Sequence, residues 1–182
     1  EKYPHVTYFI NGGREDPYPG EKRVLIPSPN VATYDLKPEM SCREVAEEVI
    51  RAIKNEEYKL IVVNFANGDM VGHTAIKDAI IQAMSELDAA LGEVVCEALG
   101  ANVATLITAD HGNCDEINNP KTGNPNTQHS RNPVPCIIID NNKKWEIINN
   151  NGGLSNVTPT VLTLMGIPKP KEMTSEQQLI KR

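Results

Sequence analysis

The sequence has few of the features that mark membrane proteins or nucleic-acid-binding proteins. No apolar run approaches the roughly 20 residues that a transmembrane helix requires. Negative charge exceeds positive charge as well, since 24 Asp and Glu residues against 18 Lys and Arg residues give a formal net charge of −6. This balance argues against a nucleic acid or an anionic membrane surface as a partner.

Cysteine is also sparse, and its placement is uninformative about metals. The 4 cysteines form no CxxC pair and no zinc-finger spacing. We therefore expect free thiols in a protein of the reducing cytoplasm. Cys114, close to Asp110 and His111, has two readings, a metal ligand or a small apolar filler, and we favour the filler.

Hydrophobic patterning predicts the fold class. At 182 residues the chain is long enough for one domain with a sizeable core. Continuous or alternating apolar runs indicate strands. The predicted strands are 5–10, 24–26, 60–65, 103–108 and 136–139, with a small hairpin at 145–148. Their order among the helices predicts an α/β layered domain with a mostly parallel sheet flanked by helices.

Helix signals are clear in three segments, which are 41–55, 76–98 and 154–165. The first opens with the capping-box pattern of Ser41 and Glu44. The second carries apolar residues at spacings of three and four, which is the pattern of an amphipathic helix. The third is followed by Gly166, a typical C-cap residue.

Acids and histidines gather where the predicted strands end. Asp69 and His73, four residues apart, follow the strand 60–65, and Asp110 and His111 follow the strand 103–108. Ligands bind at the carboxyl ends of strands in open α/β sheets. His129 lies in the long polar stretch 113–132, and loops of that length inside a domain are usually functional.

The joint placement of these residues predicts a divalent-metal site. Each pair alone also fits a solvated strand end or helix entry, and His5 fits an ordinary strand position. Together, however, carboxylate oxygens and imidazole nitrogens form a mixed ligand set for divalent cations. A pair of such ions can clamp the oxygens of a phosphoryl displacement.

The motifs around these residues carry a resemblance that spans nearly the whole chain. They are "EKYPHVTYFINGG", "SPNVATYDLKPEMS", "NGDMVGH", "ITADHGN", "QHSRNPVP" and "TPTVLTLMGIPKPKEMT". In them the chain resembles the cofactor-independent (2,3-bisphosphoglycerate-independent) phosphoglycerate mutases of the alkaline phosphatase superfamily. The resemblance implies a metal-dependent interconversion of 3-phosphoglycerate and 2-phosphoglycerate in glycolysis and gluconeogenesis, through a phosphoserine intermediate.

The resemblance also implies roles for individual residues. It assigns Asp69, His73 and His129 to one metal ion, and Asp110 and His111 to half of the ligand set of a second. The resemblance implies that both ions are Mn²⁺, with Mg²⁺, Co²⁺ or Zn²⁺ as alternatives. Lys2 matches a catalytic lysine beside the nucleophile and the transferred phosphoryl group, where its charge would act on phosphate.

The chain departs from the family pattern at Gly68, Asn30 and Asn156, and none of these positions is a ligand in the family. A further Asp ligand, the nucleophilic serine and an inserted substrate domain all precede Lys2 in the family. We therefore expect residues 1–182 to be the C-terminal segment of the metal-binding phosphatase-like domain, incomplete at its N-terminal side. We expect it to be inactive alone and to need the N-terminal segment of the same protein, which would be a monomer when complete.

Two alternatives stay open at this point. One is a metal-dependent phosphatase or phosphodiesterase of the same superfamily, against which "EKYPHVT" and "YDLKPEMS" speak because they are mutase-like. The other is a non-catalytic folding unit that binds metal.

Overall fold

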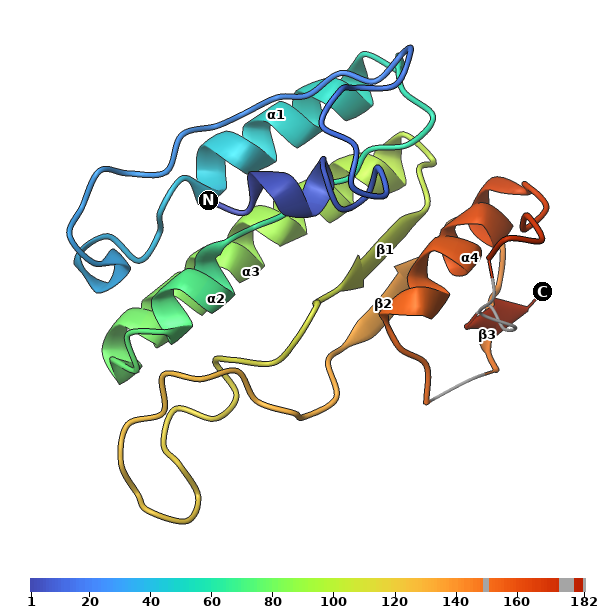
Figure 1. Cartoon of the computed structure of the whole chain (residues 1–182). Helices are drawn as coiled ribbons and strands as arrows, with labels where there is room; N and C mark the ends of the chain where they lie inside the picture. Colours follow the sequence, from blue (N-terminus) through green and yellow to red (C-terminus); the bar gives the residue numbers. More distant parts are fainter. Residues whose placement is uncertain (149–150, 174–178, 182) are drawn as a thin grey trace. The chain divides into compact units, whose positions relative to one another are not determined.

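The computed structural model describes residues 1–148, 151–173 and 179–181 (Figure 1). The chain forms two compact units. The first comprises Glu1–Glu97 and His111–Pro133, and the second comprises Ala98–Asp110 and Val134–Arg182. Among the described residues, no helix has the length and apolarity needed to cross a membrane.

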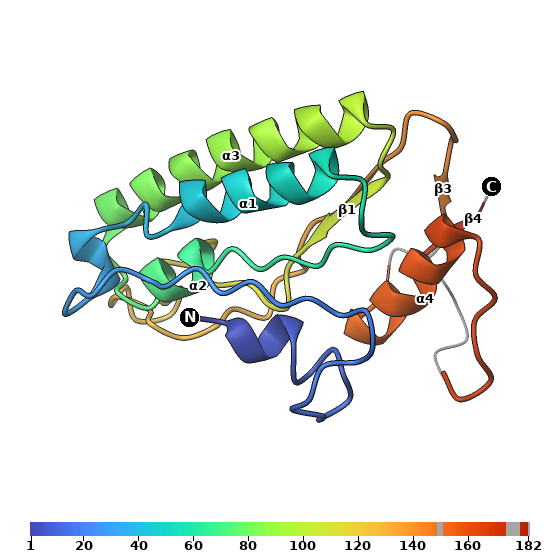
Figure 2. The same cartoon turned by 90° about the horizontal axis from the view of Figure 1, so that it is seen from above.

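The first unit is built mainly from helices. Two short 3-10 helices, η1 (Tyr3–Val6) and η2 (Tyr34–Leu36), precede α1 (Cys42–Lys54), α2 (Asn67–Gly72) and α3 (Lys77–Gly100), whose last residues belong to the second unit. Helices α1 and α3 lie side by side (Figures 1 and 2). Their exposed faces are joined by ion pairs such as Lys54 to Glu97 at 3.3 Å, which contribute little to stability.

The core of this unit fixes the position of α2. Met40, Val71, Ala79, Ile80 and Ala83 form one buried apolar cluster, and Val71 is the member that α2 supplies. The buried Asn67 side chain donates hydrogen bonds from Nδ2 to the backbone oxygens of Pro38 and Glu39 at 3.0 and 2.9 Å. A helix of six residues is too short to be stable alone, so these tertiary contacts hold it in place.

The second unit contains the strands. β1 (Thr105–Thr108) pairs antiparallel with β2 (Cys136–Ile139), and β3 (Glu146–Ile147) pairs antiparallel with β4 (Ile180–Lys181). Helix α4 (Leu154–Met165) ends at Gly166, whose φ of 71° is the left-handed conformation of a glycine C-cap. Its first turn is closed by the Asn156 side chain, which accepts a hydrogen bond from the Gly153 N–H at 2.9 Å.

Most of the elements predicted from the sequence are present. The three predicted helices are confirmed as α1, α3 and α4, and the predicted strands 103–108 and 136–139 are confirmed as β1 and β2. The four cysteines are free thiols. Cys114 packs as a filler against the buried cluster of the first unit and donates from Sγ to the Gly68 oxygen at 2.8 Å.

The prediction of a strand over residues 5–10 is wrong. This segment is η1 followed by turns, with backbone hydrogen bonds from Phe9 N to Pro4 O and from Asn11 N to Thr7 O, both at 2.9 Å. Pro4 has the φ angle of a helical first turn. Local bonds of this kind satisfy the backbone groups that a strand would offer to a neighbour.

The predictions of strands over 24–26 and 60–65 are also wrong. Both segments are irregular, and with α1 they line a groove of about 440 Å³ whose walls carry apolar and charged side chains. Leu25, Leu60 and Val62 stay exposed there. An apolar run becomes a strand only when a neighbouring backbone pairs with it, and among the described residues none does so here.

Three finer predictions need correction. The described pairings are antiparallel rather than mostly parallel. Ser41 does not cap α1, because its hydroxyl donates to the Pro27 oxygen at 2.7 Å. Residues 145–148 do not form a local hairpin, because β3 pairs with the distant β4, with Ile147 opposite Ile180.

Candidate metal centre

Helix α2 presents the first pair of candidate ligands. Asp69 lies in its first turn and His73 is its C-cap residue, so the predicted spacing of four residues places both side chains on one face. The Nε2 atom of His73 lies 3.0 Å from Oδ1 of Asp69.

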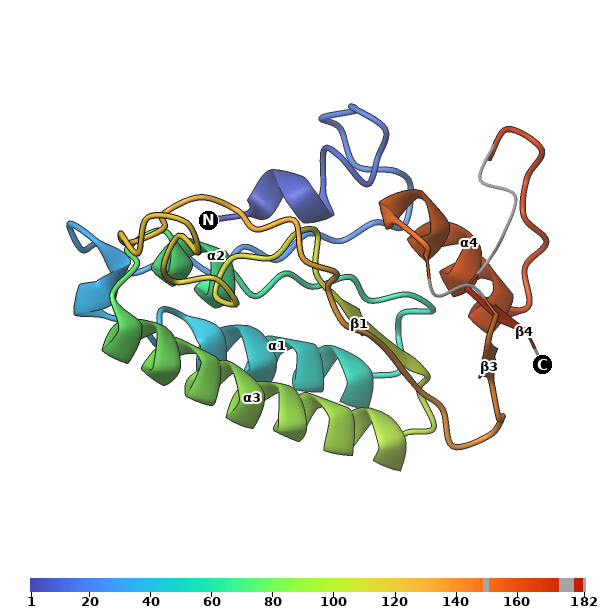
Figure 3. The same ribbon diagram turned by 90° about the horizontal axis from the view of Figure 1, so that it is seen from below.

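The other two histidines reach the same carboxylate from the chain after β1. His129 comes from the long polar loop, which folds back against α2 (Figure 3), and its Nε2 lies 3.1 Å from Asp69 Oδ1 and 3.2 Å from His73 Nε2. His111 Nε2 lies 3.9 Å from the same oxygen. The rings of His111 and His129 stack with centroids 3.6 Å apart.

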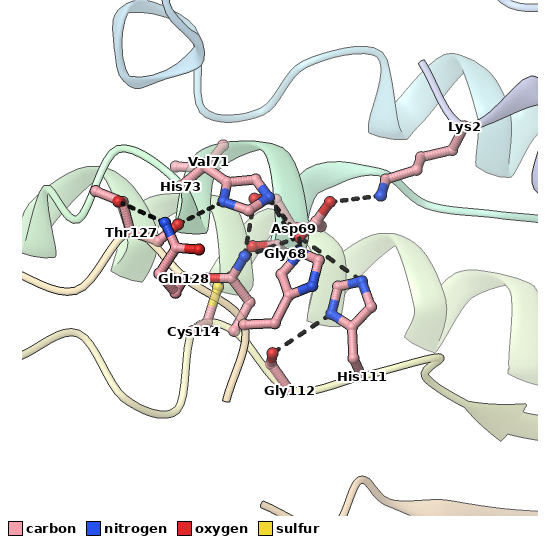
Figure 4. A network of polar contacts seen from close by, with 12 residues as sticks. Lys2, Gly68, Asp69, Val71, His73, His111, Gly112, Cys114, Thr127 and Gln128 are labelled. Atoms are coloured by element: carbon pink, nitrogen blue, oxygen red, sulfur yellow. Dashed lines mark hydrogen bonds and ion pairs between the residues drawn. The ribbon is translucent and has the colours of Figure 1, made fainter. Parts of the chain in front are cut away.

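Backbone oxygens orient two of these rings (Figure 4). His73 Nδ1 lies 2.7 Å from the Thr127 oxygen, and His111 Nδ1 lies 3.4 Å from the Gly112 oxygen. A carbonyl oxygen can only accept, so Nδ1 carries the proton in each case. In the neutral imidazole, Nε2 then keeps its lone pair and faces Asp69, which is the arrangement that a metal ligand needs.

Asp69 is held as an anion at the centre of this cluster. Its side chain is 13% exposed. Burial alone would raise its pKa, but the Lys2 ammonium group hydrogen-bonded to Oδ2 and the Asn113 amide donating to Oδ1 at 2.8 Å lower it to about 2. The lowering of the pKa by hydrogen bonds and by the charge of Lys2 therefore exceeds the rise caused by desolvation, and the carboxylate stays ionised at neutral pH.

The donor set fits a divalent cation. Two ligands that share one ion at about 2.1 Å each lie about 3.0–3.4 Å apart in octahedral or tetrahedral coordination. The separations of 3.0, 3.1 and 3.2 Å among Asp69, His73 and His129 lie in that range. Donor atoms of Asp69, His111 and His129 also lie within 4.8 Å of one another. Imidazole and carboxylate together suit Mn²⁺, Zn²⁺ and their neighbours.

The structure thus brings together five of the residues predicted from the sequence, which are Lys2, Asp69, His73, His111 and His129. Asp110, the sixth, is an exposed residue in the bend after β1 and belongs to the other unit. The division of these side chains between two ions stays a prediction.

Sequence reasoning missed Asn113. It is buried, and its Nδ2 donates both to Asp69 Oδ1 and, at 3.3 Å, to the Asp69 backbone oxygen. Its position directly after His111 and Gly112 was the available signal. An Asn in a loop also fits turn chemistry, so only the folded arrangement shows that it anchors the carboxylate of α2.

Comparison with known proteins identifies the relatives of this centre. The profile of the Metalloenzyme superfamily matches residues 1–169. The chain is 51% identical to the 2,3-bisphosphoglycerate-independent phosphoglycerate mutase of Rhodopseudomonas palustris over 97% of its own length and 34% of the relative. It is 52% identical to phosphoglycerate mutase 2 of the same type from Methanosarcina barkeri, over 100% of the chain and 34% of the relative.

A solved structure gives the same result. The crystal structure of Leishmania mexicana phosphoglycerate mutase at low cobalt concentration superposes with a TM-score of 0.91 at 32% identity, over 99% of this chain and 35% of that one. This likeness confirms the predicted alkaline-phosphatase-like α/β fold. The chain spans about a third of the length of the curated relatives that it matches. It belongs to the Metalloenzyme superfamily.

Proposed function

We propose that the full-length protein carrying this chain is a cofactor-independent phosphoglycerate mutase, an isomerase that interconverts 3-phosphoglycerate and 2-phosphoglycerate. The observation that carries the proposal is the convergence of three imidazole Nε2 atoms on one carboxylate oxygen, with Lys2 on the other oxygen. Relatives about 50% identical to the chain bear the mutase name. We also propose that the protein works in glycolysis and gluconeogenesis in the cytoplasm, as a monomer.

In this proposal two divalent ions, Mn²⁺ by preference, are held by residues of this chain and of the segment before it. Asp69, His73 and His129 hold one ion, and Asp110 and His111 supply part of the ligand set of the other. When bound, such ions stabilise the charge on a phosphoryl group and lower the pKa of a hydroxyl nucleophile.

The residues of the chain then have separate tasks. The Thr127 oxygen lies against Nδ1 of His73 and the Gly112 oxygen against Nδ1 of His111, and these contacts leave the Nε2 atoms of both rings directed toward Asp69. Lys2 brings a positive charge beside the carboxylate, where it can attract a phosphoryl oxygen. A serine outside this chain would accept the phosphoryl group from one glycerate hydroxyl and return it to the other, so that no phosphate is released.

The full-length protein, supplied with Mn²⁺ and 3-phosphoglycerate, tests the proposal. We expect 2-phosphoglycerate to form without release of inorganic phosphate. We expect Lys2→Ala to lower turnover about 10²-fold or more, far more than the modest loss of stability that follows from removing its contact with Asp69. The matched control is Lys22→Ala, which removes an exposed lysine nearby in the sequence. Phosphate release as the main outcome would instead identify a phosphatase, and full turnover in Lys2→Ala would contradict the role of Lys2.

The 182-residue chain alone gives a second test. We propose that it is the C-terminal part of the phosphatase-like domain and that it lacks the nucleophile. A covalent mechanism cannot proceed without its attacking group, so we expect no conversion of 3-phosphoglycerate by the purified chain. Conversion by the chain alone would overturn this division of the protein.

A further inference from the structure

A hydrogen-bonded cluster lies next to His111 and His129 and contains none of the predicted ligands. It joins the segment after β1 to the loop that carries His129. We call it the loop clamp, and its residues are Gly112, Asp115, Ser130 and Asn132. All four belong to the first unit, as do His111 and His129.

The Asp115 carboxylate is the acceptor at the centre of the loop clamp. The Ser130 hydroxyl lies 3.0 and 2.8 Å from its two oxygens, and Asn132 Nδ2 donates to Oδ2 at 2.6 Å. The Asn132 N–H in turn donates to Ser130 Oγ at 3.3 Å. The hydrogen bonds from Asn132 and Ser130 also hold the pKa of Asp115 below its usual range, so the acceptor is ionised at neutral pH.

Gly112 makes room for this arrangement. Gly112 and Ser130 form an antiparallel bridge, with Ser130 N donating to Gly112 O at 2.9 Å. A Cβ on residue 112 would overlap the Ser130 hydroxyl and lie 2.8 Å from Asp115 Oδ1. A side chain on residue 112 would therefore displace the Ser130 hydroxyl from the Asp115 carboxylate, and this clash explains the glycine that follows His111.

The bridge places the two histidines next to the loop clamp. The Ser130 hydroxyl and the Asp115 carboxylate fill the space that a Cβ on residue 112 would take. His111 and His129 each stand one residue earlier on the two bridged segments. Their rings stack there at an interplanar angle of 15°, above the carboxylate of Asp69.

We infer that Asp115 is a positioning residue of the metal centre: by binding Ser130 and Asn132 across Gly112, it sets the separation and register of His111 and His129. The inference rests on the proposed function insofar as that function requires a metal ion at these histidines. The inference adds an acidic residue that positions two imidazole ligands and is not itself a metal ligand.

The test is Mn²⁺ binding by the full-length protein, measured by calorimetry. We expect Asp115→Ala and Ser130→Ala each to raise the Kd for Mn²⁺ about 10-fold or more, as the loss of a partner that orients ligands does. The Kd of the double variant should be no higher than that of the more affected single variant, because both changes break the same cluster. Glu116→Ala is the matched control, since it removes an equal charge from the next residue, and its Kd should stay within about 2-fold.

Imidazole spectra of the metal-free protein, labelled with ¹⁵N-histidine, supply a readout that needs neither metal nor activity. We expect the ring signals of His111 and His129 to shift in Asp115→Ala and Ser130→Ala, and those of His73 to shift less. If both variants keep the wild-type Kd and the wild-type ring signals, the inference is wrong. If the wild type binds no Mn²⁺, the proposed function fails while the ring signals still decide the role of Asp115. Should Asp115→Ala not fold, Ser130→Ala alone decides, since it changes no charge.

Discussion

The two sides of the metal centre are built in different ways. On the α2 side, Asp69 and His73 are four residues apart and share one helical face. On the loop side, His111 and His129 stand on irregular chain, and the hydrogen bonds of the loop clamp, together with the contact of His73 with Thr127, hold their segments together. Helix geometry fixes the first pair, and side-chain hydrogen bonds fix the second.

Because of this difference, substitutions at different contacts disrupt each side of the centre. The α2 side depends on core packing under Val71 and on the contacts of Asp69 with Lys2 and Asn113. The loop side depends on polar contacts that are partly open to solvent, and regions with few buried apolar contacts open most readily. Substitutions on the two sides should therefore have different signatures.

The largest effect is expected from Asp69→Ala, which removes the residue that both sides share. Every imidazole of the cluster faces Asp69, so we expect loss of metal binding and a fall in turnover of the full-length protein of about 10³-fold or more. Steady-state kinetics with Mn²⁺ measures the effect. Asp78→Ala, an exposed acid in the first turn of α3, should retain nearly full turnover, and equal loss in both variants would mean that Asp69 has no special role.

The next comparison sets His73 against His111 in the 182-residue chain. His73 provides an Nε2 at 3.0 Å from Asp69 and also anchors the loop through Thr127, whereas His111 Nε2 lies at 3.9 Å. We expect calorimetry to give at most one weakly bound Mn²⁺ per chain. His73→Ala should abolish this binding, and His111→Ala should leave most of it. Two tightly bound ions, or loss of binding in His111→Ala alone, would reverse the assignment of ligands.

A smaller effect is expected from Lys2→Met on the metal-free fold. The folded-state pKa of Asp69 is lowered to about 2, below the value of about 3.9 for an unperturbed Asp. Ionised Asp69 therefore stabilises the fold above about pH 4, and this contribution is lost as the pH falls toward 2. We expect Lys2→Met to lower the free energy of unfolding by about 1–2 kcal/mol at pH 7. The difference should vanish near pH 2.

Urea unfolding in the presence of a chelator, followed from pH 7 to pH 2, measures this dependence. Lys22→Met controls for the loss of one positive charge. A deficit in Lys2→Met that is the same at every pH would show that the lysine acts through packing and not through Asp69.

The smallest effects are expected at two glycines of α2, and they should have opposite signs. A Cβ at Gly68 would meet only Met84 and Cys114 at 3.8 and 4.0 Å, so Gly68→Ala should stabilise the fold by about 0.5–1 kcal/mol. A Cβ at Gly72 would lie 2.7 Å from Asn113 Cγ, so Gly72→Ala should lower the melting temperature. It should also weaken Mn²⁺ binding, because it displaces the amide that holds Asp69. Thermal unfolding measures both variants, and shifts of the melting temperature with the same sign would refute this prediction.

The α2 side of the centre could be predicted from the sequence, because a spacing of four residues has a direct geometric meaning in a helix. His129 could be named only from its motif, since nothing in a long polar loop specifies which residue turns inward. Asn113 and Asp115 were not predicted at all. Their roles depend on contacts across 44 and 15 to 17 residues, and such contacts leave no periodic signal.

In the fold too, features set by local sequence could be predicted and features set by distant contacts could not. Long helices such as α3 follow from amphipathic periodicity, and β1 and β2 follow from apolar runs that find each other as partners. The run 60–65 is apolar apart from Asn64, yet unlike Cys136–Ile139 it is not a strand. Strand identity is a property of two segments together, so composition alone could not separate these cases, nor show that Ile147 pairs with Ile180.

The sequence separation of the ligands also has a consequence for the order in which the centre assembles. Asp69 and His73 come together when α2 forms, and helices form in about 0.1–1 μs. His129 contacts His73 across 56 residues, and such a contact must wait until the long intervening segment, including α3, has been ordered. We therefore expect His129 to arrive last, so that during refolding the chain passes through a state that has its helices but cannot yet hold a metal ion.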